Sequence, residues 1–350
     1  MKKLLIVTDA WSPQINGVVT TFTEVIPRLR SLGVETSVVH PGMFKTFPMP
    51  GYPEIRLARN PWLVKKLITD AGADAVHVAT EGPLGVYARN WLQRKGVRFT
   101  TSLHTKFPEY LHERSGLPIS TGYRFLRWFH QAAAVTLCTT NSHRRELQHH
   151  GLSHLRVWGR GVDTELFRPA RHRGTGPRPV LLYVGRISVE KNLEAFLSLD
   201  IDAELRVAGD GPARRDLEHR YPDAVWLGYR TGQALVDEYA RADVFVFPSR
   251  TDTFGLVMLE AMACGTPVAA YPVTGPVDVI DNDFNGYMST SLLDAVQRAL
   301  VLDRANCRTA AQAYSWQVVA DRFAEVIFGA ASPKHVDDVR PGSQNQLAAG

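Results

Sequence analysis

The sequence predicts an α/β protein built from two doubly wound parallel sheets that face each other across a central cleft. Three observations lead to this prediction. The chain has 350 residues, enough for two domains of ordinary size. Short apolar, β-branched runs alternate with amphipathic stretches along the chain, which is typical of βαβ units. Residues 161–177 interrupt this alternation with Pro, Gly and charged residues, so we expect the link between the two halves there.

The first half is expected to begin with a buried strand and a helix. Residues 4–8 read Leu-Leu-Ile-Val-Thr, an apolar run of the kind buried on both faces of a parallel sheet. Apolar residues recur at helical spacing over residues 17–32, and Gly33 suits a helix end because glycine adopts positive φ without strain. Further strands are expected at residues 36–39, 75–78, 98–103 and 134–139.

The second half repeats the alternation. In doubly wound sheets, ligands bind beyond the carboxyl ends of the parallel strands. The cleft between the two sheets is therefore the expected ligand site. The last segment, residues 331–350, lacks apolar periodicity and is expected to be disordered. The strands of the second half are expected at residues 180–184, 203–208, 224–227, 244–247 and 267–270.

Composition and charge exclude some classes of protein. No apolar run approaches the ~18 residues of a membrane-spanning helix. The apolar stretch at the start ends at Thr8, too early for a signal peptide, so we expect a cytoplasmic protein. The 3 cysteines are far apart in the sequence and predict neither a disulfide framework nor a zinc site. The net charge of +5 suits a nucleic acid, an anionic membrane or a phosphate-bearing ligand.

The clearest local signal is the segment 181–192, Leu-Leu-Tyr-Val-Gly-Arg-Ile-Ser-Val-Glu-Lys-Asn. It predicts a strand, a glycine turn and a helix that begins near Asn192. An anion at that turn would meet free backbone N–H groups and two cations, Arg186 and Lys191. A departing diphosphate needs this environment because negative charge grows on it as its bond breaks. The alternative is that both cations are solvated surface charges beside a tight turn.

A second strand, loop and helix are expected over residues 247–267. The helix would begin at Phe254-Gly255-Leu256 and end at Gly265. Asp252 would lie in the loop and Glu260 about two turns later, where their carboxylates could accept hydrogen bonds from the hydroxyls of a sugar and of a ribose. Taken singly, each acid is also explained as a helix cap or a surface residue.

Residues 208–215, Ala-Gly-Asp-Gly-Pro-Ala-Arg-Arg, resemble the start of a dinucleotide-binding fingerprint. The third glycine of that fingerprint is replaced by Arg214, which argues against a nicotinamide- or flavin-dependent oxidoreductase. The segment is better interpreted as a strand-to-helix turn with Pro212 at the first helical position. Asp281 and Asp283 have no third ligand nearby in the sequence, and we assign them no metal.

Two segments of the first half point toward the cleft. Gly17 follows the first strand, and its backbone could approach a ligand closely, although a plain turn glycine explains it equally well. His104 follows the strand expected at 98–103, at the end where α/β folds place reactive groups. This histidine could donate to a sugar or assist an acceptor hydroxyl, whereas a lone histidine is more often structural.

Residues 61–67 and 122–130 mix aromatic and basic residues at helical spacing. Such helices could dip into an anionic bilayer surface. The alternative is a set of core aromatic residues flanked by arginines whose stems cover apolar surface. The aromatic residues do not follow an RNA-recognition or OB-type pattern, so we expect no nucleic-acid partner.

Taken together, these segments resemble family 4 retaining glycosyltransferases of the GT-B architecture, with two Rossmann-like domains, from residue 4 to residue 328. The resemblance is strongest to bacterial members described as GDP-mannose-dependent α-mannosyltransferases, whose neighbours glycosylate lipids. Its motifs are Asn16-Gly17-Val18, His104-Thr105 with Phe107-Pro108-Glu109-Tyr110, Arg160-Gly161-Val162-Asp163, Gly185-Arg186 with Lys191-Asn192, Gly209-Asp210-Gly211-Pro212, and Phe254-Gly255-Leu256 with the acids on either side.

The resemblance implies a role for each site residue. Arg186 and Lys191 would hold the donor diphosphate and Glu260 the nucleotide ribose. His104 would line the reaction centre, and Asp252 would stand where the family usually has a Glu. These roles need no metal and no cofactor besides the nucleotide sugar. Gly17 would close on the diphosphate from the other domain, and the backbone N–H groups of Phe254, Gly255 and Leu256 would contact sugar or phosphate.

The resemblance also implies how the chain is divided and what it acts on. Residues 1–168 would form the acceptor-side domain, 169–313 the donor domain, and 314–330 a terminal helix that crosses back to the first domain. The expected reaction moves a hexose, with mannose from GDP-mannose favoured, to a hydroxyl of a glycerolipid or phosphatidylinositol-type lipid. The expected location is the cytoplasm, with peripheral contact at the inner membrane face.

Two alternatives remain at this level. The first is transfer from UDP-glucose, UDP-glucuronate or UDP-galactose to a lipid or polysaccharide. The second is a nucleotide-sugar 2-epimerase with the same two-domain architecture. Asp252 also leaves the donor open, since its carboxylate is shorter than that of the usual Glu by one carbon–carbon bond, about 1.5 Å, a change that is either silent or alters which sugar hydroxyl is bound.

Overall fold

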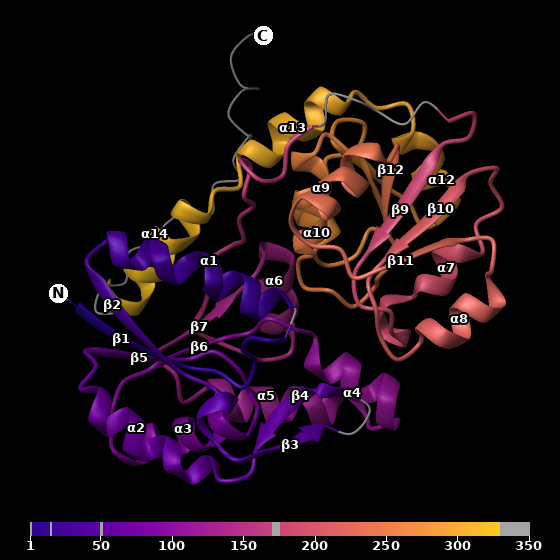
Figure 1. The fold of residues 1–350 in the computed structure, drawn as a ribbon. Helices are drawn as coiled ribbons and strands as arrows, with labels where there is room; N and C mark the ends of the chain where they lie inside the picture. Colours follow the sequence, from indigo (N-terminus) through magenta and orange to yellow (C-terminus); the bar gives the residue numbers. More distant parts are fainter. Residues whose placement is uncertain (1, 15, 50–51, 170–175, 330–350) are drawn as a thin grey trace.

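The fold consists of two α/β lobes, each with a six-stranded parallel sheet, as a computed structural model shows (Figure 1). The structure describes residues 2–14, 16–49, 52–169 and 176–329. The predicted fold class is confirmed. The expected disorder of residues 331–350 and part of the expected link, residues 170–175, lie outside the described residues.

The first sheet has the strand order β2-β1-β5-β6-β7-β8. Five of its strands match the predicted ones to within a few residues at each end, whereas β8 was not predicted. A short antiparallel hairpin of β3 and β4 lies beside the sheet and was not predicted either. The strands are β1 (Lys2–Val7), β2 (Val34–Val39), β3 (Thr46–Met49), β4 (Tyr52–Ala58), β5 (Ala75–Val78), β6 (Thr100–Ser102), β7 (Val135–Cys138) and β8 (Leu155–Val157).

The helices of the first lobe begin and end at clear local signals. α1 begins where the Asn16 side chain accepts hydrogen bonds from the backbone N–H groups of Val18 and Val19, at 3.0 and 3.1 Å. It is followed by Gly33, whose φ is 77°. The helices are α1 (Gly17–Ser31), η1 (Pro41–Met43), η2 (Pro61–Leu63), α2 (Val64–Ala71), α3 (Pro83–Arg94), α4 (Phe107–Ser115), α5 (Ile119–His130) and α6 (Asn141–His149).

The second sheet has the strand order β11-β10-β9-β12-β13-β14. All five strands predicted for this half are present, and β14 is an additional edge strand. These strands are β9 (Val180–Val184), β10 (Glu204–Ala208), β11 (Val225–Gly228), β12 (Val244–Phe247), β13 (Val268–Ala270) and β14 (Gly286–Met288). The helices are η3 (Val189–Lys191), α7 (Leu193–Leu197), α8 (Arg214–Arg220), α9 (Gly232–Arg241), α10 (Leu256–Ala263), α11 (Pro276–Val279), α12 (Leu292–Ala299), α13 (Arg304–Gln312) and α14 (Trp316–Gly329).

One predicted helix start is confirmed and another is displaced in the structure. The helix expected near Asn192 begins at Leu193 as α7, directly after Asn192, whose backbone is left-handed with φ of 53° and separates α7 from the unpredicted turn η3. The helix expected from Pro212 begins only at Arg214. By contrast, α10 begins at Leu256 and is followed by Gly265 with φ of 77°, as predicted.

The glycines of residues 208–211 serve chain packing. Gly209 has φ of 140°, and a Cβ atom there would lie 1.9 Å from the carbonyl oxygen of Gly185. Only glycine therefore lets the turn after β10 lie against the turn after β9. This close approach accounts for the partial resemblance to a dinucleotide fingerprint.

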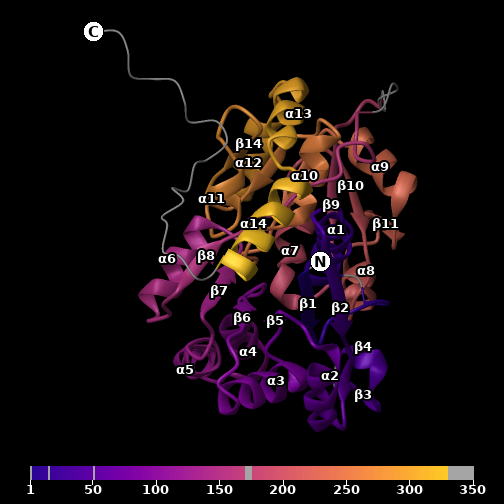
Figure 2. The ribbon, with the colours of Figure 1, turned by 90° about the vertical axis from the view of Figure 1, so that its left-hand side faces the viewer.

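The last helix, α14, leaves the second lobe and lies along α1 of the first lobe (Figures 1 and 2). Its buried side chains, Trp316, Val319, Ala320, Phe323 and Ile327, share one apolar cluster with residues of β1 and α1. Because this cluster includes side chains from both ends of the chain, α14 ties the second lobe to the first. Among the described residues, no helix is long and apolar enough to cross a bilayer.

Candidate active site

The predicted donor-side residues meet at the carboxyl ends of two neighbouring strands. η3 follows β9 and ends at Lys191, and the loop after β12 carries Asp252. The ammonium Nζ of Lys191 lies 2.5 Å from Oδ1 of Asp252. Both side chains are about four-fifths buried, with 20% and 18% of their surface exposed. The structure thus joins two residues that sequence analysis placed in separate motifs.

The second carboxylate oxygen of Asp252, Oδ2, is buried and has no hydrogen-bond partner among the described residues. A buried oxygen of this kind is costly unless a donor reaches it. The hydroxyl of a bound sugar would supply such a donor. Arg186 is half-buried on the turn after β9, five residues before η3 ends.

Glu260 lies on α10, where its carboxylate oxygen Oε2 accepts a hydrogen bond of 2.8 Å from the Tyr239 hydroxyl. Burial raises the pKa of Glu260 from 4.5 to about 7. Burial also raises the pKa of Tyr239, with a further contribution from Glu260, so the hydroxyl remains a donor at neutral pH. Glu260 is therefore poised to change charge near physiological pH.

The start of α10 lies against the first lobe. Gly255 has φ of 84°, and Leu256 follows it as the first helical residue. A Cβ atom added to Gly17 would lie 3.7 Å from a methyl carbon of Leu256. The Asn16-Gly17 turn and the Phe254-Gly255-Leu256 segment, far apart in the sequence, thus face each other where the lobes meet.

His104 follows β6 and makes hydrogen bonds through both ring nitrogens. Nε2 lies 2.7 Å from Oγ of Ser102, and Nδ1 lies 2.8 Å from the guanidinium of Arg160. Because a guanidinium only donates, Nδ1 accepts and the ring proton is on Nε2. Burial, together with the positive charge of Arg160, lowers the pKa of His104 well below 6.5. The ring is neutral, and it must release one of these partners before it can act on an acceptor hydroxyl.

Arg160 is a site residue to which sequence analysis gave no role. Its side chain is 4% exposed and packs on the Trp158 ring, with the guanidinium carbon 4.9 Å from the ring centroid. Among the described residues it forms no ion pair, and burial lowers the pKa of Arg160 to about 9. Its position next to His104 depends on the fold, since the two residues are 56 positions apart.

Within the described ranges, no three His, Cys, Asp or Glu side chains are grouped so that they could hold a metal ion. The three cysteines are all buried as free thiols.

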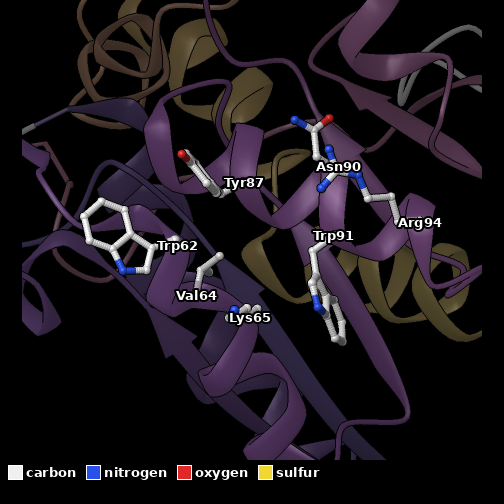
Figure 3. A pocket seen from close by; sticks show the side chains of 7 residues that line it. All are labelled: Trp62, Val64, Lys65, Tyr87, Asn90, Trp91 and Arg94. Carbon is white, nitrogen blue, oxygen red and sulfur yellow. The ribbon is translucent and has the colours of Figure 1, made fainter.

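A separate hollow of about 410 Å³ lies on the first lobe, away from the second lobe (Figures 1 and 3). It is formed by η2, α2 and α3, so it is distinct from the candidate site where the lobes meet. The side chains that line it are Trp62, Val64, Lys65, Tyr87, Asn90, Trp91 and Arg94. Three aromatic rings and two cations thus surround an open surface hollow with no acid.

Comparison with known protein families supports the same assignment for both halves of the chain. Residues 15–166 match the model described as Glycosyltransferase Family 4. Residues 178–301 match the model described as Glycosyl transferases group 1. The two matches together include every candidate site residue.

Individual glycosyltransferases are also similar to this chain in sequence or in fold. Sulfoquinovosyl transferase SQD2 of Arabidopsis thaliana is 33% identical over 306 residues, which are 78% of this chain and 60% of the plant protein. A GDP-mannose-dependent alpha-mannosyltransferase of Mycobacterium tuberculosis is 29% identical over 91% of this chain and 94% of its own. The solved sucrose-phosphate synthase of Thermosynechococcus elongatus shares the fold, with a TM-score of 0.76 and 21% identity over 95% of this chain and 100% of that chain.

Proposed function

Because the chain belongs to glycosyltransferase family 4, with the GT-B fold, and transfers a hexose from a nucleotide sugar, we propose that its donor is GDP-mannose. We further propose that its acceptor is a hydroxyl of a glycerolipid or phosphatidylinositol-type lipid, and that the anomeric configuration is retained. The mannosyltransferase that matches over nine-tenths of both chains supports the donor. The aromatic and basic surface of the first lobe supports a lipid acceptor.

The contact between Lys191 and Asp252 is the observation that carries the mechanism. In our proposal Lys191 and Arg186 neutralise the diphosphate as the sugar leaves, which replaces the charge that a divalent ion supplies in other enzymes. Asp252 accepts a hydrogen bond from a sugar hydroxyl through Oδ2, the carboxylate oxygen that has no donor among the described residues. The acceptor attacks from the leaving-group face, and the departing phosphate takes the acceptor's proton. The sugar–phosphate bond breaks as the new glycosidic bond forms.

A panel of nucleotide sugars tests this proposal directly. Consumption of GDP-mannose, UDP-glucose, UDP-glucuronate and UDP-galactose is measured with and without diacylglycerol or phosphatidylinositol. We expect GDP-mannose to be consumed fastest, and consumption to rise when a lipid is present. Faster use of a UDP-sugar would reassign the donor, and an epimerised nucleotide sugar formed without any acceptor would indicate an epimerase instead.

Glu260 makes a prediction about pH. An ionised carboxylate accepts hydrogen bonds from ribose hydroxyls more strongly than a protonated one. Since the pKa of Glu260 is about 7, we expect the donor KM to fall several-fold between pH 6 and pH 8. Glu260→Gln should have a higher donor KM at pH 8 and no pH dependence over this range, as steady-state kinetics will show.

Glu260→Gln should weaken donor binding at pH 8, but it should make the folded protein more stable at that pH. A raised folded-state pKa means that protonated Glu260 stabilises the fold below about pH 4.5, and that this contribution is lost as pH rises through about 7. Glu260→Gln should therefore raise the free energy of unfolding at pH 8 by on the order of 1–3 kcal/mol, with the difference vanishing near pH 4. A variant that is less stable at pH 8 would contradict the burial argument.

The surface hollow of the first lobe makes a prediction about membranes. Trp62 and Leu63 are 51% and 42% exposed, and Lys65 lies beside them. Aromatic side chains at an interface and cations near anionic lipid each favour adsorption. Trp62→Ser should reduce binding to vesicles of phosphatidylglycerol and phosphatidylcholine about tenfold in a flotation assay.

A matched control is available on the other lobe. Val301 is 83% exposed, so Val301→Ser removes an apolar side chain of the second lobe. This control should bind vesicles as the unchanged protein does. Equal loss of binding in both variants, or no loss in either, would remove the hollow as a membrane-contacting surface.

A further inference from the structure

Two buried threonines join the loops that carry the two halves of the candidate site. Thr253, which follows Asp252, donates its hydroxyl to the backbone carbonyl of His104 at 2.7 Å. Thr139, which follows β7, donates its hydroxyl to the backbone carbonyl of Thr253 at 2.8 Å. Their side chains belong to residues that are 5% and 1% exposed. One loop of the second lobe is thus hydrogen-bonded twice to the first lobe.

The hydroxyl protons of Thr139 and Thr253 can be placed in only one way. A carbonyl oxygen accepts and never donates, so both hydroxyl protons are committed to the contacts between lobes. His143 Nδ1 lies 3.2 Å from the Thr139 hydroxyl oxygen and must therefore donate to it. Burial lowers the pKa of His143 to about 3, which leaves a neutral ring with its single proton on Nδ1. Thr139 therefore accepts a hydrogen bond from the His143 ring while its own hydroxyl donates to the carbonyl of Thr253.

These contacts join the loop that carries Asp252 to the loop that carries His104. The backbone of Thr253 adjoins Asp252, which contacts Lys191, while the side chain of His104 is held by Arg160. We propose that Thr139 and Thr253 are positioning residues that fix the Asp252 loop against the His104 loop and so set the approach of donor sugar and acceptor. This inference rests on the proposed function. A misplacement of about 1 Å between reacting groups can lower the rate roughly a hundredfold.

Other contacts hold the lobes together without these threonines. The carboxylate of Asp278 accepts hydrogen bonds from the backbone N–H and the hydroxyl of Ser142 at the start of α6. The hydroxyl of Thr274 donates to Glu146 of the same helix at 2.9 Å. Removal of one threonine hydroxyl should therefore loosen the Asp252 loop without separating the lobes.

The test compares Thr253→Val and Thr139→Val with a matched control. Thr136→Val also removes a buried hydroxyl, one that pairs with Thr101 at 2.9 Å wholly within the first sheet. We expect Thr253→Val to lower kcat roughly 10–100-fold, with donor affinity and binding stoichiometry by calorimetry unchanged. Thr253→Ser should restore kcat to within about threefold, because it keeps the hydroxyl. The double variant should lose less than the product of the single losses, since both bonds hold one loop.

One measurement does not depend on enzyme activity, so it tests this inference separately from the proposed function. Hydrogen exchange of residues 249–255 should be faster in Thr139→Val than in Thr136→Val. Equal protection in the two variants, or equal kcat, would overturn the positioning role. A parallel loss of binding stoichiometry and kcat would show a general folding defect and would overturn it as well. If the unchanged protein consumed no nucleotide sugar while the exchange difference held, the proposed function would fail and the coupling of the two loops would stand.

Discussion

Lys191→Ala is expected to lower the rate of sugar transfer by a factor on the order of 10² to 10³ while the protein remains folded. Lys191 supplies a preorganised positive charge beside Asp252, at the carboxyl end of the sheet. Negative charge on a leaving diphosphate grows in the transition state, so loss of this cation weakens the transition state more than the ground state. The loss should therefore appear in kcat, measured as release of nucleoside diphosphate.

Two further variants define what the Lys191 result means. Arg215→Ala removes an exposed cation from α8 of the same lobe and should leave kcat unchanged. Asp252→Asn removes the negative charge that Lys191 contacts. It should also lower kcat, because the carboxylate is proposed to accept a hydrogen bond from the sugar. Turnover of Lys191→Ala within a few-fold of the unchanged protein would show that the diphosphate is neutralised elsewhere.

Phe323→Ala is expected to lower the free energy of unfolding by about 3–5 kcal/mol. The ring of Phe323 is fully buried and lies 5.0 Å from the rings of both His77 and Trp158, measured between centroids. It also packs edge-on against Phe22 of α1. Truncation leaves a cavity at the contact between α14 and the first sheet, which chemical denaturation at neutral pH will measure.

Val318→Ala provides the comparison on the same helix. Val318 is 46% exposed, so its truncation removes few buried contacts and should change the free energy of unfolding by less than about 0.5 kcal/mol. Phe323→Leu should recover part of the stability, because it fills most of the cavity. Similar losses in Phe323→Ala and Val318→Ala would mean that the buried face of α14 does not stabilise its contact with the first lobe.

The strands most fully specified by local sequence were predicted at the residues where the structure has them. β5, β9 and β12 have the bounds expected from their runs of β-branched and apolar residues. The strands that were missed are short or at edges. β8 and β14 have three residues each, and β3 contains Pro48, which weakens the strand signal.

The candidate site could be predicted only in pieces. Arg186, Lys191 and Asp252 could be proposed because each follows a predicted strand, where charged residues are chemically informative. Arg160 was named only within the Arg160-Gly161-Val162-Asp163 motif and was given no role, because a single arginine before a glycine gives no local sign that it will be buried. Its role near His104 arises only when the ends of β6 and β8 come together.

By itself, the sequence determined the two parallel sheets, the order of most of their strands along the chain and the loops that carry the charged site residues. These features follow from periodicity and turn chemistry, which act over about ten residues. Only the tertiary structure decided that Lys191 contacts Asp252, 61 residues away, and that Thr253 contacts the backbone of His104, 149 residues away. Such hydrogen bonds depend on how the strands order in each sheet and how the two lobes pack, and no local pattern encodes those distances.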